Sequence, residues 1–387
     1  MARVATVYDY LRWRGDLLFE ERPFNDVDNI VLSTLVYLDW EGIVPSEGQG
    51  EPVTLGDACG RLLARSGDDI APFVRSLANI QTTFVELLAQ SPRFSSIELS
   101  GYVDIIDKRR SLQFSALCAR LPGDETYVAF RGTDSSIVGW REDVMLSFAI
   151  TEAQREAARY LERAMQRTSG RIYVGGHSKG GMLAEYAMLQ CPERLRSRIV
   201  RVYSNDGPGM APEVVGDCGQ GNLGERIRRI VPAYSVVGML FSRPEDPRAI
   251  VASSNRGIEQ HDLTSWQVTR SGLEEVGELQ PDCVSLDEAI AVWIEKLSLS
   301  KRALVANQIF DALEAGGAQQ LDEILSSAES FHRVLQALAK TDDLTRDVAL
   351  SLVQTLLDSS VGSVRKAARR TLTKFLPPAR EPDKSRA

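Results

Sequence analysis

The residues best suited to catalysis are Gly176-His177-Ser178-Lys179-Gly180, a serine between two glycines with the spacing G-x-S-x-G. This spacing is typical of a nucleophile elbow, in which a sharp turn between a strand and a helix lifts a serine hydroxyl above a sheet. The turn strains the serine backbone, and the small neighbours Gly176 and Gly180 leave room for it. Ser178 is therefore the predicted nucleophile of an acyl-transfer reaction.

A serine hydroxyl needs a base to remove its proton, and histidine is the usual base. The chain has three histidines. His177 lies within the elbow, where its side chain diverges from the serine hydroxyl, and His332 belongs to an apolar-faced helical segment near the C-terminus. His261 lies in the polar segment 259–267, after the last strand candidate, where hydrolase triads place their base. A loop histidine is more often a satisfied surface group, but elimination of the other two favours His261.

The sequence offers several candidates for the acid that orients this base. Asp206 closes the strand candidate after the nucleophile helix and keeps the chain order serine, aspartate, histidine, so it is the first choice. The residues around it, Asn-Asp-Gly-Pro, are also typical of a turn, so the side chain of Asp206 could instead cap its own loop. Glu245 and Asp246 are the alternatives, whereas Asp262 is disfavoured because side chains of adjacent residues point apart.

Two backbone N–H groups are predicted to stabilise the oxyanion that forms on attack. The N–H of Lys179 lies at the start of the helix after the elbow and points to where the charge develops. The second donor is Thr133, in the segment 130–134 (Phe-Arg-Gly-Thr-Asp), although this segment could equally be a capped turn. The side chain of Lys179 either adds positive charge that favours an anionic substrate or lies in solvent.

Strands that alternate with helices must position these residues. Apolar runs predict strands at 113–131 (an adjacent pair), 171–176, 199–203 and from 227 to about 240. Pro232 interrupts the last of these runs. An amphipathic helix fits 151–167, and another helix starts near Lys179. The alternation predicts the α/β class with a mostly parallel central sheet.

Helices are predicted on both sides of this core. Residues 27–38 place apolar side chains on one helix face, with Asn25 or Asp26 as the N-cap. Toward the C-terminus the pattern becomes helical, with apolar stripes over 331–338 and 348–356. We expect a hydrolase domain over 1–290 that includes the N-terminal helices, a helical extension over 291–376 and a flexible tail over 377–387.

The composition excludes several classes of protein. Hydrophobic residues make up 43% of the 387 residues and charged residues 25%, which is ordinary for a globular protein. No segment reaches the apolar length that crosses a bilayer, and the first residues lack the apolar stretch of a secretion signal. The five cysteines are scattered, which argues against disulfides and a zinc site and favours a cytoplasmic location. The predicted chemistry requires no metal or cofactor.

The charge distribution limits the expected partners. A net charge of −8 gives no electrostatic reason to expect nucleic acid. Residues 365–387 include eight basic and two acidic residues, so this end could touch an anionic membrane surface or a partner, although a solvated helix face and frayed terminus is the commoner explanation. The expected partner is a small ester or lipid substrate, and the sequence identifies no protein partner.

These catalytic segments resemble those of the class 3 (fungal-type) lipases, which carry F-R-G-T, G-H-S-x-G-G and a late histidine. The matching positions here are 130–133, 176–181 and His261. A bacterial branch of that superfamily is also similar at Trp13-Arg14-Gly15-Asp16, Pro23-Phe24-Asn25, 176–181, 204–209 and His261-Asp262. The resemblance covers residues 1 to 270 and implies an α/β-hydrolase fold and ester hydrolysis, but it supplies no substrate.

The chain departs from class 3 lipases at the triad acid. In those lipases the triad acid follows the strand after the one that Asp206 closes here. The comparable stretch of this chain, 230–238, contains no carboxylate. The acid has therefore either moved to Asp206 or been lost, in which case Ser235 could hold the imidazole without stabilising its charge. We expect Ser178 to attack an ester carbonyl while His261 moves the proton. The alternative is a catalytically weak scaffold that binds or regulates a partner.

Overall fold

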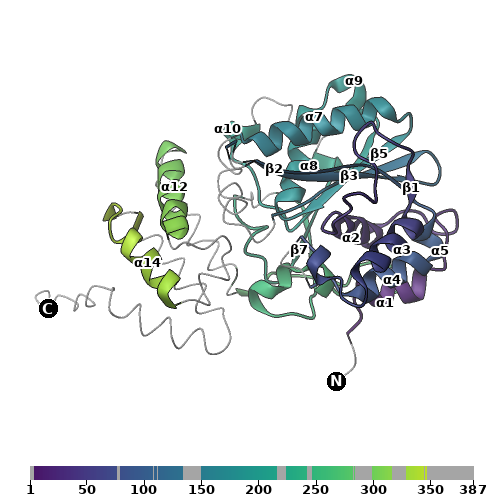
Figure 1. The fold of residues 1–387 in the computed structure, drawn as a ribbon, viewed down its shortest axis with the longest axis horizontal. Helices are drawn as coiled ribbons and strands as arrows, with labels where there is room; N and C mark the ends of the chain where they lie inside the picture. The colour runs from purple at the N-terminus through teal and green to yellow at the C-terminus, as the bar shows by residue number, and fades with distance from the viewer. Residues whose placement is uncertain are drawn as a thin grey trace, which may run out of the picture. The chain divides into compact units, whose positions relative to one another are not determined.

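The computed structural model describes residues 4–75, 79–107, 109–110, 112–133, 150–215, 224–241, 246–281, 283, 299–315, 328–343 and 345–346. The chain divides into two units, Met1–Ala303 and Leu304–Ala387. The first unit holds a sheet with helices on both faces (Figure 1). Over the described ranges, no helix has the length and apolar character needed to cross a membrane.

The described residues form a nine-stranded sheet whose strands lie in the order of the sequence. The strands are β1 (Val53–Thr54), β2 (Glu98–Asp107), β3 (Leu112–Leu121), β4 (Glu125–Phe130), β5 (Arg171–His177), β6 (Ile199–Asn205), β7 (Ile227–Pro232), β8 (Arg248–Val251) and β9 (Glu275–Val276). Neighbours from β4 to β8 pair in parallel. The pairs β1–β2, β2–β3, β3–β4 and β8–β9 are antiparallel. The α/β class is confirmed, but the prediction of a mostly parallel sheet is wrong, because the sheet is mixed.

The lengths of the connections explain the mixed sheet. Only Pro122, Gly123 and Asp124 join β3 to β4, and so short a link allows only a hairpin. By contrast, α7 (Glu152–Arg167) lies between β4 and β5 in the sequence, and α8 (Lys179–Gln190) lies between β5 and β6. Crossovers that contain a helix allow parallel pairing. The alternation of strands and helices thus describes the centre of the sheet and not its flanks.

Most predicted elements of this core are confirmed. The paired strands at 113–131 are β3 and β4, the helix at 151–167 is α7, and the strands at 171–176 and 199–203 are β5 and β6. The strand predicted from 227 to about 240 instead ends at Pro232. Proline offers no N–H to a neighbouring strand, and the chain turns directly after it. β1, β2, β8 and β9 were missed: β1, β8 and β9 are too short to show a clear periodicity, and a register shift between Ser100 and Val103 interrupts β2.

Helices bury both faces of the sheet. The N-terminal helices are α1 (Val7–Arg14), α2 (Asp26–Leu35), α3 (Leu55–Ser66), α4 (Thr82–Gln90) and α5 (Pro92–Ser95). Tyr127 and Ala129 of β4 pack into the same core as these helices, whereas Val128 and Phe130 pack with α7 and α8. Figure 1 shows α7 and α8 on one side of the sheet and α1 to α4 on the other. Shorter helical segments are η1 (Ala71–Phe73), α9 (Glu193–Arg196), α10 (Pro212–Val215), η2 (Gly224–Arg226), η3 (Gly257–His261) and η4 (Leu263–Ser265).

Helix α2 begins where the sequence predicts. The side chain of Asn25 accepts a hydrogen bond from the N–H of Val27 at 2.9 Å, and the carboxylate of Asp28 accepts from the N–H of Asn25 at 3.0 Å. This reciprocal capping satisfies N–H groups that a helix start leaves without partners. All residues from Val27 to Leu35 are buried, so the polar ones need partners inside the protein. Asp28 finds one in the buried guanidinium of Arg93, at 2.5 Å.

Two helices of the C-terminal region are described, α12 (Leu299–Ala315) and α14 (Ala328–Leu338). In α14, Val334, Leu335 and Leu338 are buried, which agrees with the apolar stripe predicted there. The second predicted stripe, at 348–356, and the tail at 377–387 lie outside the described residues. The domain boundaries at 290 and 376 stay predictions.

Candidate active site

Ser178 occupies the turn between β5 and α8. Its backbone has φ 57° and ψ −129°, in the left-handed half of backbone space that residues with a side chain rarely adopt. A β-carbon added at Gly176 would lie 2.4 Å from the carbonyl carbon of Gly180, and one added at Gly180 would lie 2.2 Å from the carbonyl oxygen of Phe130. The turn therefore requires both glycines of the G-x-S-x-G spacing, as a nucleophile elbow does.

The segment after β4 crosses directly beside this turn. A β-carbon added at Gly132 would lie 3.2 Å from the β-carbon of Ser178 and 2.6 Å from the carbonyl oxygen of His177. Arg131 fixes the segment, because its buried guanidinium donates two hydrogen bonds to the carboxylate of Asp104, at 2.7 and 2.8 Å. Thr133 follows Gly132 and is partly buried, so the predicted oxyanion residue lies beside the elbow. Asp134 lies outside the described residues.

Asp206 and His261 are hydrogen-bonded to each other. Asp206 comes directly after β6 and has φ 48°, and its Oδ2 lies 2.6 Å from Nδ1 of His261. Its other oxygen accepts hydrogen bonds from the hydroxyl of Ser235 and, at 3.1 Å, from the N–H of Gly238. Asp206 is fully buried, whereas the side chain of His261 is 25% exposed. A buried carboxylate with three donors on it can orient an imidazole and stabilise its charged form.

His177 connects this pair to the elbow. Its ring lies against the ring of His261, with centroids 4.3 Å apart and planes tilted by 41°. Nδ1 of His177 lies 2.9 Å from the hydroxyl of Tyr37. Burial lowers the pKa of His177 well below its usual value, so this ring is neutral at pH 7. The imidazole bound to Asp206 therefore packs on the residue that directly precedes Ser178.

The other candidate acids have different partners. Oδ1 of Asp262 accepts from the N–H and hydroxyl of Thr264, at 2.9 and 2.8 Å. Asp246 lies 3.6 Å from a nitrogen of Arg229, and Glu245 lies outside the described residues. The carboxylate of Asp206 binds residues of two other loops, so it does not serve only to cap its own turn.

Two alternatives from the sequence need correction. The side chain of Lys179 is not in solvent, because it is buried and its ammonium donates to the backbone oxygen of Gln113 at 3.0 Å and to the side-chain oxygen at 2.8 Å. Its ammonium therefore binds β3 and does not lie in solvent, which the position of Lys179 at a helix start did not indicate. Ser235 bonds the candidate acid Asp206 and so supports that carboxylate instead of replacing it.

Sequence reasoning missed several residues that contact this site. Tyr37 binds His177, Gly238 supplies an N–H to Asp206, and the amide of Asn205 links the neighbouring strands. Each of them lies far along the chain from the residue that it contacts, so no helix or strand period relates the two. A single sequence therefore gave no signal for these contacts. Asn205 was visible only as the neighbour of Asp206.

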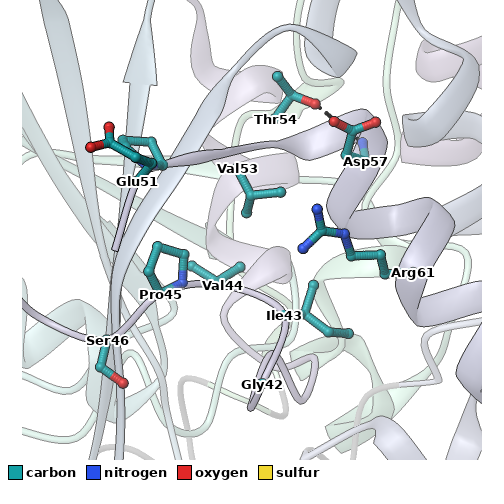
Figure 2. Close-up of a pocket in the computed structure, with 11 residues that line it drawn as sticks. Gly42, Ile43, Val44, Pro45, Ser46, Glu51, Val53, Thr54, Asp57 and Arg61 are labelled. Atoms are coloured by element: carbon teal, nitrogen blue, oxygen red, sulfur yellow. Dashed lines mark hydrogen bonds between the residues drawn. The ribbon is translucent and has the colours of Figure 1, made fainter. Parts of the chain in front are cut away.

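No group of His, Cys, Asp and Glu side chains that could hold a metal ion exists in the parts of the chain that the structure describes. A surface pocket of about 560 Å³ lies between the segment 42–46 and the start of α3, with apolar Ile43, Val53 and the guanidinium of Arg61 around it (Figure 2). Neither Ser178 nor His261 lines this pocket, so it is separate from the candidate active site.

Comparison with known proteins gives a family match and several similar structures. A family model described as Mbeg1-like matches residues 88–311, more than half of the chain. Curated protein sequences give no match. The Rhizomucor miehei lipase–propeptide complex is 18% identical, with 41% of this chain and 57% of that chain covered and a TM-score of 0.30.

Two further lipase structures are similar. A fungal lipase–inhibitor complex is 14% identical over 65% of this chain and 82% of that chain, with a TM-score of 0.35. The Lip2 lipase of Yarrowia lipolytica is 13% identical over 60% of this chain and 100% of that chain, with a TM-score of 0.30. This chain spans less than two thirds of the Rhizomucor miehei lipase and of the M37 lipase, 57% and 61% of their lengths.

Proposed function

Because this chain belongs to the Mbeg1-like family and places an Asp206–His261 pair beside a serine elbow, we propose that it is a serine hydrolase that cleaves carboxylic esters. The observation that carries the proposal is the hydrogen bond between the buried Asp206 carboxylate and Nδ1 of His261, whose ring packs on the residue before Ser178. A binding scaffold has no need of a buried acid, an oriented imidazole and a strained serine together.

The role of His261 in the reaction follows from which of its two ring nitrogens binds Asp206. Because Nδ1–H donates to Asp206, the other nitrogen, Nε2, has its lone pair free to act as the base. Ser178 Oγ attacks the ester carbonyl carbon while Nε2 takes the hydroxyl proton, and Asp206 stabilises the resulting imidazolium. The N–H groups of Thr133 and Lys179 stabilise the oxyanion of the tetrahedral intermediate.

Collapse of the intermediate breaks the bond to the alcohol and leaves an acyl group on Ser178. His261 returns its proton to the departing alcohol. A water molecule then attacks the acyl carbonyl, with His261 again taking a proton, and the acid product leaves with Ser178 restored. No cofactor enters any of these steps.

The relationship to class 3 lipases is also part of the proposal. Asp206 follows β6, whereas in those lipases the triad acid follows the next strand. In this chain the next strand is β7, so the corresponding position lies in the loop after β7. Ser235 and Gly238 of this loop both donate to Asp206. We infer that the acid moved to the neighbouring strand and that the vacated loop supplies its donors. A bacterial branch of the lipase superfamily would share this arrangement.

A cytoplasmic location is proposed on the state of the cysteines. Cys59, Cys118, Cys191 and Cys283 are free thiols, and Cys218 lies outside the described residues. Free thiols persist in a reducing compartment. A small ester or a lipid is the proposed substrate class, and contact of the basic C-terminal end with a membrane surface stays a prediction.

The first test is labelling with a fluorophosphonate, a reagent that attaches to activated serines, followed by intact mass. The wild-type protein should gain one adduct, and Ser178→Ala and His261→Ala should gain none. Ser169→Ala and His332→Ala are matched controls that should label as the wild type does, because Ser169 is an exposed partner of Asp124 and His332 lies on α14. If folded wild-type protein stays unlabelled even with detergent or lipid, it is a binding scaffold.

A further inference from the structure

Helix α2 sends two polar side chains to the strand ends that carry the proposed nucleophile and acid. Asn29 and Ser33 lie one helical turn apart and are fully buried. Both lie outside residues 88–311, the part that the family model matches. We propose that Asn29 and Ser33 are positioning residues of the hydrolase, which hold the Ser178 elbow and Asp206 in register through the side chain of Asn205. This inference rests on the proposed function.

Asn205 is the centre of this network. Its amide nitrogen donates to the backbone oxygen of Gly176 at 3.0 Å and to the hydroxyl of Ser33 at 3.0 Å. Its amide oxygen accepts from the side chain of Asn29 at 2.8 Å. Gly176 belongs to β5 just before the elbow, and Asn205 directly precedes Asp206. One buried amide thus joins the strand of the nucleophile, the strand of the acid and helix α2.

Tyr127 of β4 completes the network from the strand on the other side of β5. Its hydroxyl donates to the amide oxygen of Asn29 at 2.7 Å and lies 2.7 Å from the hydroxyl of Ser33. A β-carbon at Gly175 would lie 2.0 Å from this hydroxyl, so the glycine makes room for it. No polar atom of these side chains is buried without a partner in the described structure. A satisfied, directional network of this kind fixes relative position.

The location of the network favours positioning over simple packing. The rest of α2 already buries apolar side chains against the sheet, so attachment of the helix does not need polar residues. Buried polar groups cost free energy unless every bond is made, and apolar residues would hold the helix as well. The backbone adds a matching link, since the N–H of Ser178 donates to the oxygen of Asn205 at 2.9 Å. The bonds therefore fall where β5 and β6 end and the catalytic residues begin.

Helix α2 offers its own control. Thr34 is the neighbour of Ser33 and is also buried, but its hydroxyl donates within the helix, to the oxygen of Ile30 at 2.7 Å. The full-length variants Ser33→Ala and Asn29→Ala each remove hydrogen bonds of the network, whereas Thr34→Val removes a buried hydroxyl that makes no bond to β5 or β6. We would measure fluorophosphonate labelling rates, kcat and KM for a p-nitrophenyl ester, and the downfield NMR signal of the proton between His261 and Asp206.

The expected result is a loss of about 10-fold to 100-fold in kcat and labelling rate for Ser33→Ala and Asn29→Ala, with KM almost unchanged. Their downfield signal should shift or broaden, and Thr34→Val should match the wild type in all readouts. Should Asn29→Ala fail to fold, Ser33→Ala decides, because it deletes a single oxygen.

Two results would overturn the inference in distinguishable ways. Wild-type labelling with undiminished rates in both network variants, or equal losses in all three variants, removes the positioning role and leaves the proposed hydrolase intact. An unlabelled wild type removes the proposed function and the positioning role with it.

Discussion

Ser235 donates a hydrogen bond to the carboxylate of Asp206 from the loop that follows β7. The N–H of Gly238, from the same loop, reaches the same oxygen at 3.1 Å. The other oxygen is left for His261, at 2.6 Å. The carboxylate is therefore held on one side by a fixed loop and presents its free side to the imidazole, which is what orientation of a base requires.

Replacement of Asp206 by asparagine should nearly abolish catalysis without unfolding the protein. The amide keeps the shape of the side chain but cannot stabilise the imidazolium, and it favours the wrong tautomer of His261. We expect a loss of about 10⁴-fold in kcat for a p-nitrophenyl ester, the size of the effect in other triads. Asp246→Asn, which changes a carboxylate paired with Arg229, is the control and should retain activity. Full activity of Asp206→Asn would mean that another group orients the base.

Ser235→Ala should have a smaller effect of the same kind. The substitution removes one donor to Asp206 and leaves the Gly238 N–H in place. A hydrogen bond to a charged group contributes about 1.5 to 3 kcal/mol, so we expect a fall in kcat of about 10-fold to 100-fold. Ser254→Ala removes a hydroxyl that donates to Ser265, and its kcat should stay at the wild-type level. Equal kcat values in the two variants would count against the role of Ser235.

Gly132→Ala should displace the segment that carries the proposed oxyanion donor. The added β-carbon would lie 2.2 Å from the hydroxyl of Tyr37 and 2.6 Å from the backbone oxygen of His177, so the segment has to move. Loss of one oxyanion donor costs about 10²-fold to 10³-fold in kcat. Gly60→Ala, on helix α3 with open space around it, should leave kcat unchanged and stabilise the helix by about 1 kcal/mol. Kinetics and urea unfolding of both variants test this, and an active Gly132→Ala would contradict it.

His177 should make the stability of the fold depend on pH. Its pKa is lowered by burial, so the folded ring stays neutral while the unfolded ring takes up a proton below about pH 6.5. The unfolded state then binds more protons, so stability that is present above about pH 6.5 is lost as the pH falls, by up to about 1.4 kcal/mol per pH unit. His177→Gln, which does not titrate, should reduce this slope in urea unfolding, and the exposed-helix variant His332→Gln should keep it. Identical slopes in all three proteins would contradict the role of His177.

The turn at Ser178 and the central strands could be predicted because their signals are local. The residues that form the elbow are contiguous, and the strands on either side of it are long enough for their apolar runs to stand out. Asp206 could be proposed from chain order because it ends the strand next to the elbow strand. His261 followed from the small number of histidines and from its place after the last strand candidate.

The contacts that hold these residues could not be predicted, because their partners are far apart in the chain. Asn29 and Asn205 are 176 residues apart, and Tyr37 and His177 are 140 apart. Neither pair has a spacing that a strand or helix period would reveal. The antiparallel direction of the flanking strands follows from connections too short for a crossover. The Lys179 side chain is buried because its ammonium donates to a backbone oxygen of β3, a contact that local sequence does not reveal.

The order of the sheet, in which each strand pairs with its neighbours in the sequence, bears on how the protein is made. A chain that leaves the ribosome from its N-terminus finds the partner of every new strand already present, and such local pairing closes short loops first. Helix α2 and β4 are synthesised before the elbow that they contact, and His261 comes after β8. Folding during synthesis would thus build the scaffold first and complete the proposed catalytic residues last, so that the nascent chain would lack the proposed activity until nearly all of its sheet exists.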